Sequence, residues 1–209
     1  MLFVINKYKF GKNKTMNVNR ELIESVFRKL NYEIADANII GIRSAMDIPD
    51  VFNDLIILWI PALNVFNVFE ATTDPGLYYM QNPMNVKGTG ILKSGQYKKC
   101  YRLGFHGTNK VTGHSALVQV NNVTVYRDVN RDAKKDFLVT DTGLFGCNIH
   151  TTCSTLCGVP VNIGKWSASC QVVRNNRKFQ TDLINVLKSN FDLNKLYNYT
   201  LLTEKELSL

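Results

Sequence analysis

Residues 148–173 read NIHTTCSTLCGVPVNIGKWSASCQVV, and we expect the rest of the chain to be organised around this stretch. His150 ends an alternating apolar run, and Cys170 follows within Ser-Ala-Ser-Cys. The residues between them are rich in Gly, Pro, Ser and Thr, which predicts a loop. Because such a loop lets its two flanks approach each other, the stretch suits a thiol nucleophile and its base.

The three residues before Cys170 are all small, namely Ser167, Ala168 and Ser169. Small side chains allow a tight turn and leave backbone N–H groups open to a developing oxyanion, which acyl transfer requires. We therefore take these four residues, with His150, as the candidate catalytic group. The alternative is that Cys170 is an inert buried thiol and His150 a hydrogen-bonded polar residue, because free cysteines are commonly buried.

The run LFGCNIH at residues 144–150 alternates as a strand does, with Phe145, Cys147 and Ile149 on one side. His150 is thus expected at a strand end, on the side opposite the buried one. The flank at residues 171–173 is also strand-like. We expect the two flanks to point toward one spot.

Two further side chains are candidates for contact with a substrate. Trp166 stands next to the expected oxyanion turn, where an indole stacks on a sugar or forms the floor of a pocket, although core packing is the usual role of tryptophan. His106 and His114 lie in a glycine-rich stretch that predicts a loop. A loop position makes either histidine a candidate substrate contact or an alternative base to His150, with simple exposure as the other interpretation.

The motifs NIH at residues 148–150 and SASCQV at residues 167–172 resemble the signature of the L,D-transpeptidase catalytic domain. In that family an Ile-His-Gly strand precedes a Ser-His-Gly-Cys motif that a hydrophobic residue follows. The resemblance implies a nucleophile at Cys170, a base at His150 and an oxyanion hole from the main chain of residues 168–170. It also implies an L,D-transpeptidase-like mixed β-sheet or barrel domain.

The motif departs from the family pattern at three positions. Ala168 and Ser169 stand where the family usually has His and Gly, and Thr151 stands where Gly follows the base. The resemblance is therefore to a divergent branch. Other segments resemble uncharacterised proteins of bacteriophages and their hosts that end in the same motifs, and these segments are residues 69–76, 87–92, 95–97, 123–128 and 143–146.

The resemblance implies a phage-encoded cysteine peptidase that acts on the stem peptides of bacterial peptidoglycan. Cys170 would attack a carbonyl next to a diamino-acid centre, and water or a second amine would resolve the acyl-enzyme. Peptidoglycan is then the partner, with other virion proteins as further candidates. The competing hypothesis is a virion or wall-binding module of the same fold whose catalytic site has decayed.

Composition limits the class of protein. The chain has 209 residues, of which 45% are hydrophobic and 20% charged, which is enough apolar material for a core. A net charge of +8 favours a polyanionic partner such as nucleic acid, an anionic membrane or the bacterial wall. No helix-turn-helix or finger pattern is present, so we expect no nucleic-acid partner.

Neither a signal peptide nor a membrane anchor is expected. Residues 1–14 read MLFVINKYKFGKNK and lack the long apolar segment of a secretory signal. The longest apolar stretch, residues 55–63, contains Pro61 and is much shorter than a membrane helix. We therefore expect synthesis in the host cytoplasm, with action at the bacterial cell wall or carriage in the virion.

Short apolar runs divided by Gly, Asn and Asp predict a mainly β (α+β) fold, with one helix near each end. We expect an N-terminal helical and strand appendage at residues 1–50, a catalytic domain at 51–190 and a C-terminal tail at 191–209. The expected strands are residues 39–43, 55–60, 65–70, 116–120, 123–126, 137–139 and 144–149. The expected helices run from Asn17 or Asn19 to about Leu30 and over residues 178–189.

The acyl-transfer chemistry requires no cofactor, but one loop suggests calcium. Oxygen-bearing side chains occupy positions 1, 3, 5 and 9 of a calcium-loop pattern, and they are Asp128, Asn130, Asp132 and Asp136. Ala133 replaces the usual turn glycine and Val139 the bidentate carboxylate. A solvated hairpin loop is the alternative.

The five cysteines form an odd set, which favours reduced thiols. Cys153 and Cys157, three and seven residues after His150, could also be read as zinc ligands. No second Cys or His pair completes such a site, so this interpretation is disfavoured.

Overall fold

The computed structural model describes residues 7–10, 14–46, 48–108, 113–153 and 158–208, with side chains from residue 17 onwards. Its strands are β1 (Lys7–Phe10), β2 (Lys14–Asn17), β3 (Asn38–Arg43), β4 (Asp54–Ile60), β5 (Val65–Thr72), β6 (Thr89–Leu92), β7 (Gly95–His106), β8 (His114–Gln119), β9 (Val123–Asp128), β10 (Thr140–Gly143), β11 (Ile149–Thr151), β12 (Gln171–Val173) and β13 (Leu196–Thr203). Its helices are α1 (Arg20–Lys29), η1 (Pro61–Leu63), α2 (Leu77–Gln81), α3 (Asn176–Lys178), η2 (Phe179–Ile184), α4 (Asn185–Asn190) and η3 (Glu206–Ser208).

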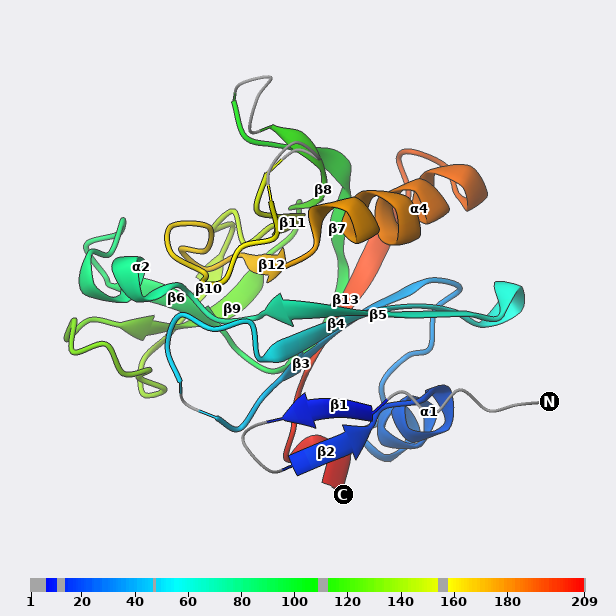
Figure 1. Ribbon diagram of the computed structural model, residues 1–209, viewed down its shortest axis with the longest axis horizontal. Helices are drawn as coiled ribbons and strands as arrows, with labels where there is room; N and C mark the ends of the chain where they lie inside the picture. The colour runs from blue at the N-terminus through cyan, green and yellow to red at the C-terminus, as the bar shows by residue number, and fades with distance from the viewer. Residues whose placement is uncertain (1–6, 11–13, 47, 109–112, 154–157, 209) are drawn as a thin grey trace.

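Eight strands close into a barrel in the order β11-β12-β5-β4-β3-β13-β7-β8 (Figure 1). Most neighbours are antiparallel, but β3 runs parallel to β13 and β11 runs parallel to β12. The ring closes where Ile149 of β11 pairs with Leu117 of β8. The mainly β architecture expected from the sequence is confirmed.

The strands β3 and β4 are buried on both faces, and the reason is a helix on the outer side. Their outward residues form one hydrophobic cluster with Ile23, Val26 and Phe27 of α1. Phe27 and Trp59 meet edge to face, with ring centroids 6.1 Å apart. The helix begins where expected, because the Asn19 side chain accepts a hydrogen bond from the Leu22 N–H at 2.9 Å.

The barrel interior is filled by apolar side chains and is covered on one side by the helical segment of residues 176–190. Figure 1 shows this segment on the opposite side of the sheet from α1. Its buried residues share the helical face that the sequence predicts: Phe179, Leu183, Ile184 and Leu187. Where the sequence predicts one helix, the segment changes from α to π and back. No helix in the described part of the chain is long and apolar enough to cross a membrane.

A small sheet of β6, β9 and β10 lies beside the barrel and carries the loop at residues 129–139. Residues 137–139, expected as a strand, are irregular and exposed here. Their apolar side chains find no partner strand, since β9 pairs instead with β6 and β10. The run at residues 144–148 is also not a strand, although its inward residues Phe145 and Cys147 do pack against the barrel core.

The barrel takes strands from both of the terminal segments that were expected to lie outside the catalytic domain. Residues 38–43 were expected in an appendage and residues 196–203 in a tail, yet they pair with each other as β3 and β13. β13 also pairs with β7, and β3 with β4. The structure therefore differs from the expected division at residues 50 and 190, because pairing between distant segments leaves no local signal.

Candidate functional site

The parallel pairing of β11 with β12 brings the two halves of the candidate motif together. Ile149 lies opposite Gln171 and His150 opposite Val172. The Gln171 N–H donates to the Asn148 carbonyl at 2.9 Å, so Cys170 stands directly before the paired segment. Gln171 also reaches into the barrel, where its Oε1 accepts from the Tyr199 hydroxyl at 3.0 Å. Since successive side chains alternate across a strand, Cys170 and His150 belong to the outer face.

The turn at residues 167–170 is held by its own hydroxyl and by the chain that precedes α2. Ser167 Oγ donates to the Cys170 carbonyl at 2.8 Å, and the Gly76 N–H donates to the Ser167 carbonyl at 2.8 Å. No backbone carbonyl of a described residue accepts from the N–H groups of Ala168, Ser169 or Cys170, although the Ser169 N–H does interact with the Cys170 sulfur. Backbone N–H groups in a fixed turn of this kind are the donors that an oxyanion hole needs.

The Cys170 thiol is protonated at rest. Its side chain is buried, with 8% exposed, and the S–H donates to the Gly146 carbonyl at 3.4 Å. Burial, together with the nearby Cys147 thiol, raises the pKa of Cys170 to about 12, although the backbone N–H groups of Asn148 and Ser169 lower it in part. The lowered pKa expected of a preformed nucleophile is thus not found.

His150 is also neutral and lies beneath the surface. Its Nδ1–H donates to the Thr151 carbonyl at 2.6 Å, which leaves the lone pair on Nε2. Burial lowers the pKa of His150 well below its ordinary value, and the neighbouring His106 lowers it further. No hydrogen bond joins the His150 ring to the Cys170 sulfur.

All three histidines of the chain gather at this place. His106 ends β7 and His114 begins β8, where the two residues face each other in the antiparallel register. The His106 ring stacks on the His150 ring, with centroids 3.7 Å apart, and its Nδ1 accepts from the Asn148 Nδ2 at 3.1 Å. The expectation of a loop for His106 is therefore wrong. The alternation of the flanking residues, with a glycine-rich turn between, is the signal that predicts such a hairpin.

A pocket of about 280 Å³ opens beside the turn that precedes Cys170. Its lining includes Ala168 and Ser169 of that turn, together with Arg127 and Phe145. The Arg127 guanidinium lies 4.5 Å from the centroid of the Phe145 ring. Arg127 was not among the site residues predicted from the sequence, because nothing in the surrounding strand β9 marks it as different from a surface arginine.

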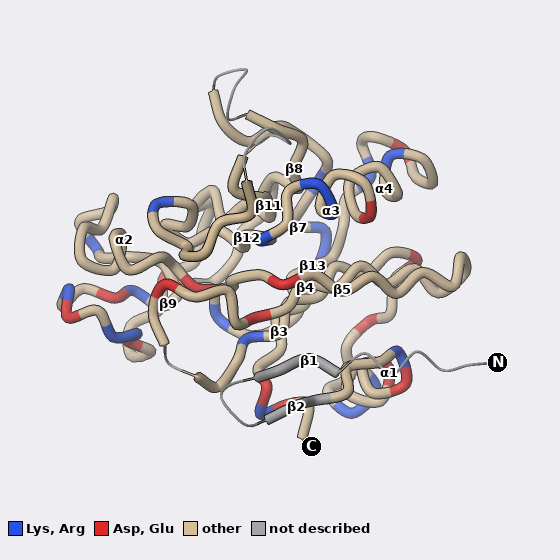
Figure 2. Tube along the Cα trace, viewed as in Figure 1, with Lys and Arg blue, Asp and Glu red and all other residues tan. Residues whose placement is uncertain are grey.

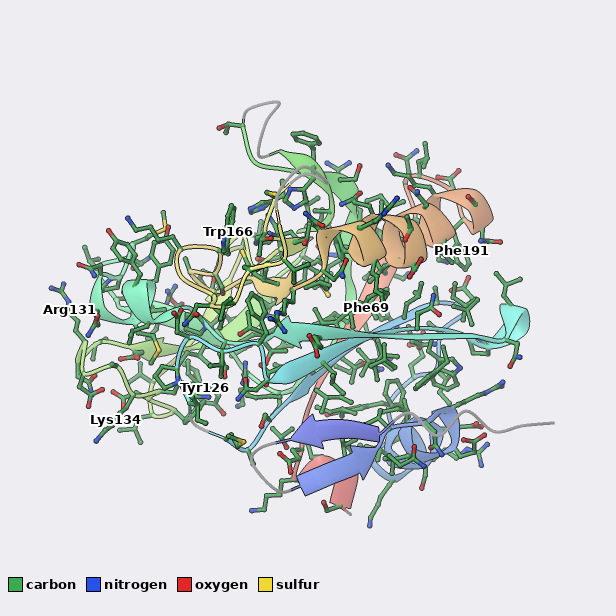
Figure 3. All side chains as sticks on the ribbon, viewed as in Figure 1. Phe69, Tyr126, Arg131, Lys134, Trp166 and Phe191 are labelled. Atoms are coloured by element: carbon green, nitrogen blue, oxygen red, sulfur yellow. The ribbon has the colours of Figure 1, made fainter. Side chains whose placement is uncertain are left out.

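Arg127 is a buried cation at the pocket wall. Its Nη2 lies 3.0 Å from Asp141 Oδ2 and its Nη1 donates to the Gly88 carbonyl at 3.2 Å. Trp166 does not line this pocket; it projects from the loop before β12 with 38% of its surface exposed (Figure 3). His106 does not line it either.

The four candidate metal ligands differ in solvent exposure. Asp128 ends β9 and is fully buried, whereas Asn130 and Asp132 are exposed and Asp136 is half-buried. Among the described residues, no group of three or more His, Cys, Asp or Glu side chains is arranged to hold a metal ion.

The cysteines do not form a zinc site. Cys153 is joined in a disulfide, so its sulfur is not a thiolate ligand and the expectation of reduced thiols is wrong at this position. Cys157 lies outside the described residues. Cys100, Cys147 and Cys170 are free and buried.

The site thus combines a turn that carries backbone N–H donors, a neutral thiol, a neutral imidazole on the adjacent strand and an open pocket. This arrangement suits the attack of sulfur on a carbonyl carbon once a substrate is bound. Comparison with protein-family models, with curated proteins and with solved structures finds no match for the chain.

Proposed function

We propose that the chain is a cysteine-dependent acyl-transfer enzyme that acts on the stem peptides of bacterial peptidoglycan. The parallel pairing of β11 with β12 carries the proposal, because it sets the His150 strand directly beside the Cys170 turn. The adjoining pocket of about 280 Å³ gives a substrate access to the same turn. A mixed β barrel is also compatible with an L,D-transpeptidase-like fold.

The reaction would proceed through a thioester. Cys170 Sγ attacks the substrate carbonyl while its proton passes to Nε2 of His150, and the N–H groups of residues 168–170 bind the oxyanion. The C–N bond then breaks, and His150 returns the proton to the leaving amine. Water or a second amine attacks the thioester and releases Cys170 as a thiol.

The Cys170 thiol and the His150 imidazole must both be neutral before this reaction, and they must approach each other as the substrate binds. The Cys170 side chain has to turn away from the Gly146 carbonyl and toward His150. Active sites of this kind commonly reach hydrogen-bonding geometry only in the substrate complex. The proton transfer is then part of the attack, rather than the formation of a resting ion pair.

The choice of peptidoglycan rests on the motif resemblance and on charge. The net charge of +8 favours an anionic polymer. Basic and acidic residues are interspersed over the described chain (Figure 2). The positive charge therefore attracts an anionic polymer without forming a basic stripe typical of a nucleic-acid interface. A phage-encoded enzyme would use hydrolysis, because hydrolysis opens the wall. It would reach the wall either in the virion or by release from the host.

A second candidate is a wall-binding or virion module that has the fold without the activity. The raised pKa of Cys170 and the absence of a Cys170–His150 hydrogen bond favour it. The departures from the motif at Ala168 and Ser169 favour it as well.

Mass spectrometry of digested peptidoglycan separates the two candidates. The wild type should yield shortened or exchanged stem peptides from at least one of several wall chemistries. Cys170→Ala and His150→Ala should yield none, since nucleophile and base act as a unit. Cys100→Ala is the matched control, because it removes another buried free thiol, in the barrel core.

Retained activity in Cys100→Ala with none in Cys170→Ala would support the enzyme. If the wild type and Cys170→Ala bind peptidoglycan equally well and neither changes it, the binding module replaces the enzyme as the proposed function.

A further inference from the structure

In the loop between β9 and β10, side-chain oxygens accept hydrogen bonds from backbone N–H groups two residues further along the chain. Asn130 Oδ1 accepts from the Asp132 N–H at 3.1 Å, and Asp132 Oδ1 accepts from the Lys134 N–H at 2.8 Å. Arg131 and Ala133 both have a left-handed backbone, with φ of 62° and 66°. These turns keep the chain compact but do not by themselves indicate a ligand.

The burial of the Asp128 carboxylate does indicate a ligand. Its side chain is fully buried, and neither carboxylate oxygen has a hydrogen-bond partner. Burial, together with the carboxylates of Asp136 and Asp132, raises the pKa of Asp128 to about 6, and the backbone N–H of Asn130 lowers it in part. A buried carboxylate without a partner is costly, so this arrangement calls for a cation.

No side chain that the structure describes supplies that cation. Lys135 Nζ lies 2.7 Å from Asp74 Oδ2, and Arg127 is directed to Asp141. Arg131 and Lys134 are exposed and point outward from the loop (Figure 3).

Among the described residues, no basic side chain forms an ion pair with any of the three loop carboxylates. The buried carboxylate of Asp128 therefore lies without a described ion-pair partner, and Asp132 and Asp136 of the same loop add negative charge.

We propose that this loop binds a calcium ion through the side-chain oxygens of Asp128, Asn130, Asp132 and Asp136. Calcium takes six to eight hard oxygen ligands in adaptable geometry, so water and a backbone carbonyl would complete its shell. Without the ion, mutual repulsion holds the carboxylates apart, and the ion draws them together. Val139 replaces the bidentate carboxylate of high-affinity loops, so the dissociation constant is expected at about 10⁻⁴ to 10⁻³ M.

The ion would also fix one wall of the pocket beside the Cys170 turn. Asp128 follows Arg127 directly and pairs with Thr89 of β6. Both Arg127 and Thr89 line that pocket. The calcium site is nevertheless independent of the proposed enzyme activity and is tested without it.

Isothermal titration calorimetry and thermal unfolding of the whole chain test the proposal, with calcium chloride as ligand and magnesium chloride as comparison. The wild type should bind one calcium ion. At about 10 mM calcium its melting temperature should rise by roughly 3 to 10 °C, and a chelator should reverse the rise. Magnesium should have a much smaller effect, because it requires near-ideal octahedral geometry.

Three variants make the test specific. Asp128→Asn should bind calcium at least about tenfold more weakly and yet melt at a higher temperature than the wild type when calcium is absent, since it removes an unpaired buried charge. Asp136→Asn, at a half-buried position, should also lose affinity, and it keeps the test available if Asp128→Asn does not fold. Glu21→Gln, an equal change of charge in α1, should bind as the wild type does.

Two results would overturn the proposal. One is the absence of calcium binding to the wild type at about 10 mM, well above the expected dissociation constant. The other is equal affinity in Asp128→Asn, Asp136→Asn and Glu21→Gln, which would place any bound calcium elsewhere.

Discussion

The reactivity of Cys170 toward iodoacetamide follows directly from its burial. Only the thiolate is alkylated, and burial raises the pKa of Cys170 to about 12. At about pH 7.5 an ordinary thiol with a pKa of about 8.5 is roughly 10% ionised. A thiol with a pKa of about 12 is ionised to roughly three parts in 100,000 at that pH, so Cys170 should react roughly 3,000-fold more slowly than a free thiol.

The assay is a time course of alkylation followed by peptide mass spectrometry. The rate at Cys170 in the folded protein is compared with the rate at the same residue in the chain unfolded in urea. It should rise about tenfold for each unit of pH up to the alkaline limit of the fold, since the thiolate fraction does so below the pKa. His150→Ala should leave it unchanged, because no hydrogen bond joins the two side chains at rest.

Cys100 supplies an internal control, since burial raises the pKa of its thiol to about 12 as well. Labelling of Cys170 near neutral pH at the rate of the unfolded chain, with Cys100 unlabelled, would refute the reasoning. It would mean that His150 or the turn already stabilises a thiolate, and that the resting site is activated without substrate.

Three further predictions concern the stability of the fold. Gly41→Ala should destabilise the protein by about 1 to 3 kcal/mol, because the added Cβ would lie 2.0 Å from the Tyr199 hydroxyl. Urea denaturation measures this loss of stability. In a double-mutant cycle, Tyr199→Phe should reduce the cost of Gly41→Ala. Burial lowers the pKa of both His150 and His106, so these groups stabilise the fold above the unfolded value of about 6.5 and this contribution is lost as pH falls below it. Subtracting the pH profile of His150→Gln from that of the wild type isolates the His150 effect from the carboxylates, and a difference independent of pH would contradict it. Asn19→Ala should cost about 1 kcal/mol by removing the N-cap of α1, and an unchanged urea midpoint would show that the cap is dispensable.

Elements with a strong local signal were predictable from the sequence. The cap at Asn19 and the apolar spacing of residues 22–30 predict α1, and unbroken apolar runs predict β3 and β4. The long strand β7 and the last strand β13 were missed, because polar and aromatic residues interrupt their apolar pattern. Their place in the barrel depends on partners that are distant in sequence.

The candidate site was predictable in its parts but not in its electrostatics. The small residues before Cys170 predict a tight turn, and the structure has one. Spacing says nothing of solvent exposure, so the burial that raises the pKa of Cys170 and lowers that of His150 had no sequence signal. The stacking of His106 on His150 depends on the β7–β8 register and on β11, which three separate segments determine.

The parallel pairing of β3 with β13 has a consequence for biosynthesis. β13 is translated after every other strand of the barrel, yet it fills the space between β3 and β7. Until it arrives, both of those strands present unpaired backbone edges, which are sites for aggregation. Barrel closure is therefore a late, long-range step, and a nascent chain that stalls before residue 196 would be a substrate for chaperones rather than a folded protein.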